Sequence, residues 1–213
     1  DATYTYDYAY DDAGTHLLDS ITYPTSTSAY RLKLKYTYTE GFLTQIADFA
    51  VPTTVFWSRN QLDAAGHITQ ETLANGLKTT RAFDSVSGFL NSIQTGTTGN
   101  PTLRQNVSYL WDRMGSLTQR QDNAQGITEN FYYDPLHRLD YSTLKVGAGA
   151  PTTNLDMAYD AMGNITSKSD VGSYTYHASR KHAVITAGSY TFSYDNNGNM
   201  TAGRGATIAR TSY

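Results

Sequence analysis

The sequence contains no cysteine and few charged residues. The absence of cysteine excludes disulfides, thiolate metal sites and cysteine nucleophiles together. Charged residues make up 16% of the 213-residue chain, and its formal net charge is −3 without a basic run. The electrostatic footprint of a nucleic-acid-binding protein is therefore missing, and we expect no nucleic-acid partner. No apolar stretch has the roughly 18 residues of a membrane-spanning helix, and the first residues do not form a signal peptide.

Tyrosine is the residue type in which the chain is rich. It contains 18 tyrosines, and hydrophobic residues make up 39% of the sequence. This composition is too aromatic for a disordered chain and too polar for a membrane span, so we expect a folded protein. Because a chain without disulfides can fold in the cytoplasm or after export, composition leaves the compartment open.

One short pattern recurs along the chain. An aromatic residue, usually followed by Asp, precedes a loop that closes on Gly, and an aliphatic residue and often Thr follow. We call each copy a landmark turn. Two copies agree at every position, from Tyr159 to Thr166 and from Tyr194 to Thr201. The copies recur at roughly 20 to 27 residues, which is the range of repeat architectures. The landmark residues are Tyr10, Asp11 and Gly14; Tyr38 and Gly41; Asp63 and Gly66; Phe83, Asp84 and Gly88; Trp111, Asp112 and Gly115; Tyr133 and Asp134, with His137 in place of Gly; Tyr159, Asp160 and Gly163; Tyr176, followed by His177; and Tyr194, Asp195 and Gly198.

Each residue of the landmark turn has a physical role in forming the turn. An Asp that opens a tight turn can accept hydrogen bonds from the backbone two residues on. The Gly supplies the positive φ that a three-residue hairpin loop with a bulge requires. The aromatic and the aliphatic residue then lie on paired strands. We therefore assign these residues structural roles in turns.

A weaker turn signal lies between successive landmark turns, at Asn75-Gly76, Gln125-Gly126 and Val171-Gly172. Each repeat is thus two short strands and two turns. Aromatic and aliphatic residues alternate with polar ones, as in a strand, at positions Tyr4, Tyr6, Tyr8 and Tyr10; Leu32, Leu34, Tyr36 and Tyr38; and Tyr190, Phe192 and Tyr194. No window shows the periodicity of a helix.

The predicted fold is all-β: an array of short antiparallel β-hairpins that forms a curved, spiralling β-sheet ribbon. Residues 1–213 form a single array of about nine repeats. Both ends look cut, and residues 207–213 are typical of the approach to another landmark turn, so we expect a fragment of a longer protein. The tyrosines should pack across strands with Leu43, Ile68, Leu90, Leu117, Ile165 and Met200.

The candidate chemical sites have structural explanations. The histidines at 16, 67 and 137 lie in turns, where solvated positions explain them, and His177 and His182 would point to opposite faces of a strand. The segment from Asp195 to Asn199 resembles a calcium loop but lacks the acidic residue that an EF-hand has at loop position twelve. The paired acids Asp11 and Asp12 could act in a glycosidase, but Asp11 occupies a turn position. We expect no enzyme, and no catalytic, cofactor or metal site; a hydrolase is kept as a third class of function.

The motif from Tyr159 to Thr166 and from Tyr194 to Thr201 resembles the YD repeat of the Rhs (rearrangement hot spot) family. The stretches Leu73–Asp84 and Lys181–Val184 also look like bacterial members. The resemblance covers nearly the whole chain. It implies a ribbon that spirals into a hollow shell, as in insecticidal toxin complexes, bacterial polymorphic toxins and teneurins. The family's self-cleaving Asp-Pro-x-Gly signature has no match here, since Asp134-Pro135-Leu136-His137 shares only the dipeptide.

The resemblance implies a scaffold segment whose parent encloses a toxic C-terminal polypeptide. Its expected partners are neighbouring repeats and that polypeptide, and its bare strand edges could also pair with a second copy. A bacterial protein, secreted or at a cell surface, is implied. The alternative is a cell-surface module that binds carbohydrate or protein through its tyrosine-rich face. Such a module predicts aromatic residues gathered at one concave site, whereas a wall predicts the even distribution that the sequence shows.

Overall fold

The computed structural model describes residues 4–12, 14–204 and 206–207, and over this range the protein is all-β. Nineteen strands occur in the described residues, which confirms the predicted fold class. The last predicted approach to a landmark turn, at residues 208–213, lies outside the described residues. In the described part of the chain, no helix has the length and apolar character needed to cross a membrane.

The chain divides into two compact units, Asp1–Tyr109 with Asp122–Ala124 and Leu110–Gln121 with Gln125–Tyr213. The strands of the first unit are β1 (Asp7–Tyr10), β2 (Leu18–Thr22), β3 (Lys33–Thr39), β4 (Phe42–Asp48), β5 (Val55–Leu62), β6 (Ile68–Leu73), β7 (Lys78–Phe83), β8 (Leu90–Thr97) and most of β9 (Asn100–Trp111). Those of the second are β10 (Leu117–Asp122), β11 (Ile127–Tyr133), β12 (Leu139–Val146), β13 (Thr152–Tyr159), β14 (Ile165–Lys168), β15 (Gly172–Tyr176), β16 (Val184–Ala187), β17 (Tyr190–Tyr194), β18 (Met200–Gly203) and β19 (Ala206–Thr207).

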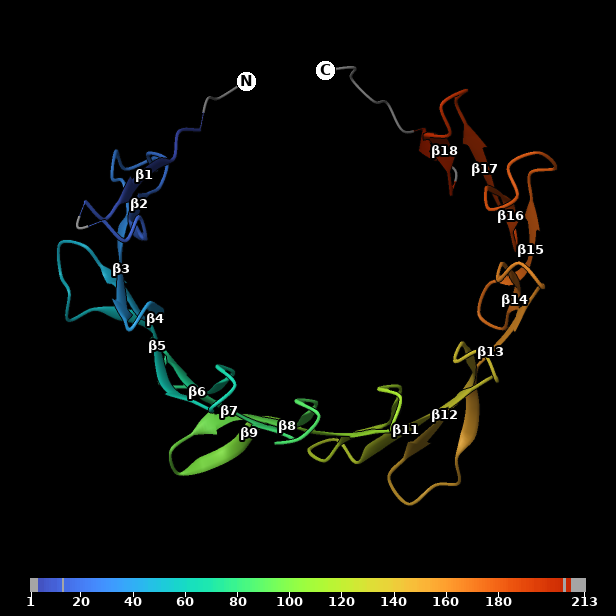
Figure 1. Ribbon diagram of the computed structural model, residues 1–213, viewed down its shortest axis with the longest axis horizontal. Helices are drawn as coiled ribbons and strands as arrows, with labels where there is room; N and C mark the ends of the chain where they lie inside the picture. The colour runs from blue at the N-terminus through green and yellow to red at the C-terminus, as the bar shows by residue number, and fades with distance from the viewer. Residues whose placement is uncertain (1–3, 13, 205, 208–213) are drawn as a thin grey trace. The chain divides into compact units, whose positions relative to one another are not determined.

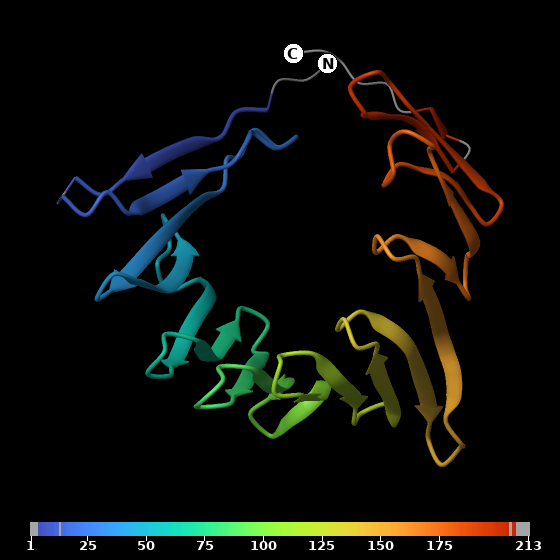
Figure 2. The ribbon, with the colours of Figure 1, turned by 45° about the vertical axis from the view of Figure 1, so that its right-hand side comes forward.

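Within each unit, strands that follow one another in the chain pair antiparallel, from β1 to β9 and from β11 to β19. The strands of a unit form a single layer, and hairpin loops line its two edges (Figures 1 and 2). Each landmark turn joins an odd-numbered strand to the next strand. In each unit the landmark turns therefore share one edge, and the other turns share the opposite edge.

In the part of the chain that the structure describes, eight landmark hairpins contain a β-bulge beside the first landmark residue, which is aromatic in all of them except at Leu62. In β13–β14, Ala158 is opposite Ser167 but Tyr159 is opposite Ile165, so Thr166 is an extra residue on the returning strand. The register shifts at the same repeat position in β1–β2, β3–β4, β5–β6, β7–β8, β11–β12, β15–β16 and β17–β18. The aromatic and aliphatic landmark residues are thus cross-strand partners, and the Thr that often follows them is at the bulge.

Few side chains in this single layer are fully buried. Among the described residues, the buried ones are small or polar: Ser20, Ala47, Thr79, Gly96, Ser142, Asn164 and Ala187. The aliphatic residues predicted to pack across strands are half-buried instead, namely Leu43, Ile68, Leu90, Leu117, Ile165 and Met200. A strand layer covers its side chains from one side only, so the interactions along the layer must hold the fold together.

The first strand is shorter than the alternating tyrosines predict. β1 begins at Asp7, which is opposite Thr22, and Tyr4 and Tyr6 precede the strand. The partner strand β2 ends at Thr22 and is soon followed by Pro24, which has no N–H to donate to a pairing strand. Leu32 likewise falls one residue before β3. An alternating pattern thus needs a partner of equal length to become a strand.

Gly147 and Gly188 lie in turns at the edge opposite the landmark turns. Substitutions at these two glycines can test how closely such turns approach one another. Gly147 and Gly188 have φ of 57° and 56°. A Cβ at Gly188 would lie 1.9 Å from the Val171 carbonyl oxygen, whereas one at Gly147 meets nothing within 4 Å. We predict that Gly147→Ala costs about 1 kcal/mol for the left-handed conformation alone. Gly188→Ala should cost about 1–3 kcal/mol more, because the backbone must move.

Urea unfolding of both variants and the parent chain measures this difference. Equal free energies of unfolding for the two variants would show that the Gly172 and Gly188 turns do not approach as described.

Candidate functional site: the landmark turns

The landmark turn is a three-residue loop closed by two backbone hydrogen bonds. The Asp160 N–H donates to the Asn164 carbonyl at 2.9 Å, and the Gly163 N–H donates to the Asp160 carbonyl at 3.1 Å. Gly163 has a φ of 87°, which a residue with a Cβ rarely adopts. The same pair of bonds closes the loops that begin at Asp63, Asp112, Asp134 and Asp195.

The Asp carboxylate locks this loop from inside. Asp160 Oδ1 accepts the N–H of Met162 at 2.8 Å and the N–H of Asn164 at 2.9 Å. Asp63, Asp112, Asp134 and Asp195 each accept the N–H groups two and four residues on, at 2.8 to 2.9 Å. These carboxylates therefore act in turn closure, as the spacing predicts.

The bonds favour the ionised carboxylate. The side-chain hydrogen bond from Asn164 lowers the pKa of Asp160, and the one from His67 lowers the pKa of Asp63. At Asp112 and Asp134 the first cause of the lowered pKa is the backbone N–H four residues on, from Ser116 and Arg138.

The residue after the Gly is a structural position that sequence reasoning missed. Its side chain donates to the second oxygen of the Asp, Oδ2: His67 Nδ1 lies at 2.8 Å, Arg138 Nε at 2.7 Å, and Asn164 and Asn199 Nδ2 each at 2.9 Å. A signal was present, because this position is a polar side chain in every landmark turn of standard length. Its residues are His67, Ser116, Arg138, Asn164 and Asn199.

The divergent copies keep the turn by other means. His137 replaces the Gly and still has a φ of 57°, in the left-handed region where His is enriched among non-glycine residues. Glu40 and Gly41 both have positive φ, at 54° and 81°, which makes a two-residue turn and explains why this copy is one residue short. Asp84 closes a longer loop by accepting the N–H groups of Val86 and Ser87. At the first turn, Asp11 accepts the Thr15 hydroxyl at 2.7 Å and its N–H donates to the Leu17 carbonyl.

Three histidines make contacts in these turns or between them that a solvated side chain would not make. The His67 ring stacks on Phe83 with centroids 4.4 Å apart, so the expectation of a merely solvated residue is wrong for His67. His177 takes the place of the Asp, because its Nδ1 accepts the Ser179 N–H at 3.2 Å and the Arg180 N–H at 3.3 Å. His182 Nδ1 lies 2.6 Å from Asn164 Oδ1, which ties two landmark turns together.

A second set of bonds joins successive repeats in part of the chain. In the second unit, the hydroxyl of a landmark Tyr donates to the carbonyl of the aliphatic residue one landmark turn earlier. Tyr133 donates to Leu117 at 2.8 Å, Tyr159 to Leu139 at 2.8 Å and Tyr176 to Ile165 at 2.9 Å. We call these three bonds the tyrosine struts. Each crosses from an odd-numbered strand to the even-numbered strand before it.

The struts require a protonated phenol. Burial is the first cause of a raised pKa at Tyr133, Tyr159 and Tyr176, so all three hydroxyls remain donors at neutral pH. The carbonyls of Leu139 and Ile165 directly precede a bulge residue, where the regular pairing of the strands is interrupted. The struts of Tyr159 and Tyr176 thus supply a hydrogen bond where a bulge interrupts the pairing of the strands.

Arginines make further contacts between successive turns. The Arg138 guanidinium lies 4.3 Å from the Tyr159 ring centroid, and its Nη1 donates to the Asp160 carbonyl at 3.4 Å. Arg180 Nη1 donates to the Asp195 carbonyl at 2.7 Å. Beside Phe83, which has no hydroxyl, Arg81 Nη1 donates to the Ile68 carbonyl at 3.5 Å instead.

The site's chemistry is therefore that of repeated turn closure. Across the described ranges, no three His, Asp or Glu side chains are grouped so that they could hold a metal ion. In each landmark turn of standard length, the structure brings together the Asp and the Gly, or His137 in its place. The struts link three of the landmark tyrosines to the preceding turns.

No family model matches the chain. A search of curated proteins finds no match either. Among solved structures, crystal structures of TcdB2-TccC3-TEV and TcdB2-TccC3-Cdc42 each align with 92% of this chain, at 15% identity and a TM-score of 0.38. TcdB2-TccC3 without its hypervariable C-terminal region aligns with 89%, at 15% identity and a TM-score of 0.37. The chain is similar to part of TcdB2-TccC3. It spans about 15% of the length of those chains.

Two adjacent tyrosines test the struts. Tyr133→Phe removes one strut hydroxyl, whereas Tyr132→Phe removes a hydroxyl from a ring stacked on Tyr141 with centroids 4.3 Å apart. We predict that Tyr133→Phe lowers the free energy of unfolding by about 1 kcal/mol, the usual contribution of one hydrogen bond. Tyr132→Phe should leave it unchanged. Chemical denaturation measures both, and equal effects would contradict the structural role of the strut.

Acid should weaken the landmark turns. Because the pKa of Asp63, Asp112, Asp134 and Asp160 is lower in the folded chain, their contribution to stability is complete above the ordinary pKa of Asp, near 3.8. It is lost as the pH falls through the lower, folded-state values. Urea midpoints measured from pH 7 to about pH 2.5 should be flat at first and then fall steeply.

The double variant Asp134→Asn and Asp160→Asn should be less stable at neutral pH and show a shallower fall in acid, because Asn cannot titrate. Asp12→Asn, at an exposed loop residue, is the control. A fall as steep in the double variant as in the control would assign the acid sensitivity to other groups.

Proposed function

We propose that the chain is a structural scaffold, a segment of the wall of an Rhs/YD-repeat shell. The observation that carries the proposal is the interlock between repeats. Each standard landmark turn is closed by an Asp carboxylate, and in the second unit the struts of Tyr133, Tyr159 and Tyr176 attach one repeat to the next. These interactions fix a strand layer that has few fully buried side chains.

We propose that the chain is not an enzyme. The landmark Asp residues are its most regular acidic groups, and their oxygens are occupied by backbone and side-chain donors within the same loop. A general acid or base needs a raised pKa near the working pH, whereas the bonds lower the pKa of these carboxyls. Their arrangement supports turn closure rather than proton transfer.

We also propose what such a shell encloses. In the longer protein that a wall segment implies, the shell would enclose a toxic polypeptide, with neighbouring repeats as the partners of this chain. A bacterial protein, secreted or at a cell surface, follows from the same resemblance. The even spacing of the landmark residues along the sequence supports a wall more than a single binding site.

Protease protection in that longer protein tests the proposal. The polypeptide joined to the repeats should resist an added protease in the intact protein and be digested when it is expressed alone. Replacing Tyr133, Tyr159 and Tyr176 together by Phe should make it accessible, because three contacts between repeats are lost. A double variant with Tyr132→Phe and Tyr190→Phe keeps the struts and is the control. If this polypeptide is digested equally fast in the intact protein and when expressed alone, the repeats do not enclose it and the proposal is rejected.

A further inference from the structure

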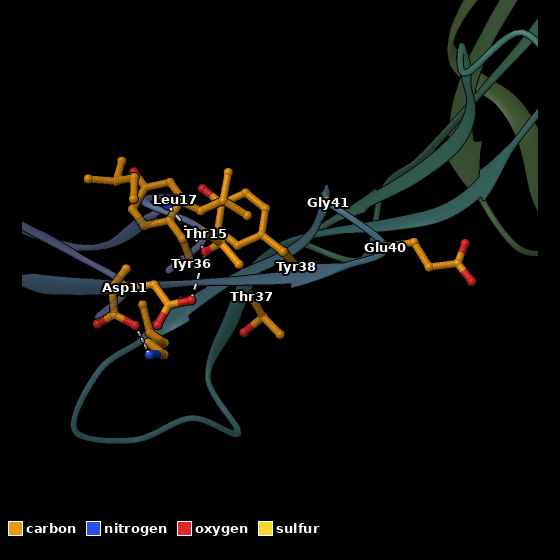
Figure 3. Close-up of a pocket in the computed structure, with 11 residues that line it drawn as sticks. Asp11, Thr15, Leu17, Tyr36, Thr37, Tyr38, Glu40 and Gly41 are labelled. Carbon is orange, nitrogen blue, oxygen red and sulfur yellow. Dashed lines mark hydrogen bonds and ion pairs between the residues drawn. The ribbon is translucent and has the colours of Figure 1, made fainter. Parts of the chain in front are cut away.

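The strands β2 and β3 part before they reach the landmark turns. They pair only at Ser20, Ile21 and Thr22 of β2, opposite Lys35, Leu34 and Lys33 of β3. Between their parted ends lies an open cavity of about 680 Å³, which we call the β2–β3 gap (Figure 3). Its lining includes Asp11, Leu18, Asp19, Lys35, Tyr36 and Tyr38. A volume of this size is within the range of small-molecule sites.

No strut spans the β2–β3 gap. Tyr38 holds the same repeat position as Tyr133, and Leu18 precedes its bulge residue Asp19 as Leu139 precedes Asp140. In the second unit a strut spans three of the corresponding openings, at β10–β11, β12–β13 and β14–β15. Tyr38 and Leu18 are both described residues, and no hydrogen bond joins the Tyr38 hydroxyl to the Leu18 carbonyl.

The gap combines aromatic rings with hydrogen-bond acceptors. Tyr36 and Tyr38 are two residues apart on β3 and line the cavity, and both keep an exposed part. Asp19 forms an ion pair with Lys35, and Asp11 is the other carboxylate of the lining that belongs to this end of β2. Glu40 points away from the cavity (Figure 3). Two carboxylates and one ammonium group therefore leave one net negative charge, which favours a cationic ligand group.

The chain itself shows which cation suits this geometry. At other landmark turns, the guanidinium groups of Arg81 and Arg180 donate to backbone carbonyls, at 3.5 and 2.7 Å. Arg138 combines such a bond with a position over the ring of a landmark tyrosine, 4.3 Å from its centroid. In the first landmark turn, Arg138 has no equivalent: the residues after Gly14 are Thr15 and His16.

We propose that the β2–β3 gap binds the guanidinium group of an arginine in another polypeptide. The guanidinium stacks on the tyrosine rings and donates to the Asp19 carboxylate and the Leu18 carbonyl. A planar guanidinium group with several fixed donors can stack on a ring and at the same time donate to a carboxylate and a carbonyl. An ammonium group cannot do this as well. This binding role is separate from the scaffold role, and neither requires the other.

A titration followed by NMR tests the site in the whole chain. The probe is a capped Gly-Gly-Arg-Gly-Gly peptide, compared with the same peptide containing citrulline or lysine. The arginine peptide should shift the signals of Tyr36 and Tyr38, the lysine peptide should bind more weakly, and the neutral citrulline peptide should bind least. Asp19→Asn should weaken binding of the arginine peptide about tenfold, since it removes a charged acceptor.

Asp140→Asn is the matched control, because Asp140 has the bulge position of Asp19 beside an opening that the Tyr159 strut closes. It should leave binding unchanged. Lys35→Met removes the competing ammonium group and should strengthen binding, a result of opposite sign that loss of folding cannot produce.

Several outcomes would overturn the proposal. They are the absence of shifts with the arginine peptide, equal binding of the citrulline peptide, or equal weakening by Asp19→Asn and Asp140→Asn. Shifts of the same tyrosine signals by a neutral oligosaccharide but not by the arginine peptide would assign the gap to carbohydrate instead. If Asp19→Asn fails to fold, weaker binding to Lys35→Met than to the parent chain contradicts the proposal by itself.

Discussion

A single layer of strands cannot surround its side chains, and this constraint determines how the chain is held together. Large aliphatic residues such as Ile165 and Met200 reach only a half-buried state, while the fully buried positions belong to small or polar residues such as Ala47 and Ser142. Hydrophobic burial alone therefore leaves each repeat weakly fixed. The repeat compensates by closing one edge with Asp carboxylates and, in the second unit, by attaching successive strands through tyrosine hydroxyls.

The features that could be predicted from sequence are local ones. Asp160 and Gly163 lie three residues apart in one loop, and the rules of turn chemistry specify both the acceptor and the positive φ. The cross-strand partnership of Tyr159 and Ile165 follows from the same loop, because the turn length fixes which residues are opposite one another. The all-β fold class follows in turn from the number of such loops.

What could not be predicted depends on contacts between repeats. The Tyr159 hydroxyl reaches the carbonyl of Leu139, which directly precedes the bulge residue Asp140, and the landmark pattern does not specify which groups of two successive repeats meet. The Asn164 side chain was overlooked because its role, donation to Asp160 Oδ2, belongs to a position that the motif leaves variable. The early start expected for the first strand was wrong for a similar reason: the pattern at Tyr4 and Tyr6 says nothing about where the partner strand ends.

Comparison of the copies shows that the repeat preserves hydrogen-bonding roles more strictly than residue types. His177 Nδ1 accepts the backbone groups that an Asp accepts elsewhere, and Arg81 supplies the donor that Phe83 lacks. His137 takes the left-handed conformation without being Gly. Because each substitute fills its role with a different shape, the openings between strands are not identical along the chain. The β2–β3 gap is a case in which the donor is present, as the Tyr38 hydroxyl, but makes no hydrogen bond to the Leu18 carbonyl of the earlier strand. Where one repeat lacks a hydrogen bond that other repeats make, a structural repeat can thus become a local binding site without a change of fold.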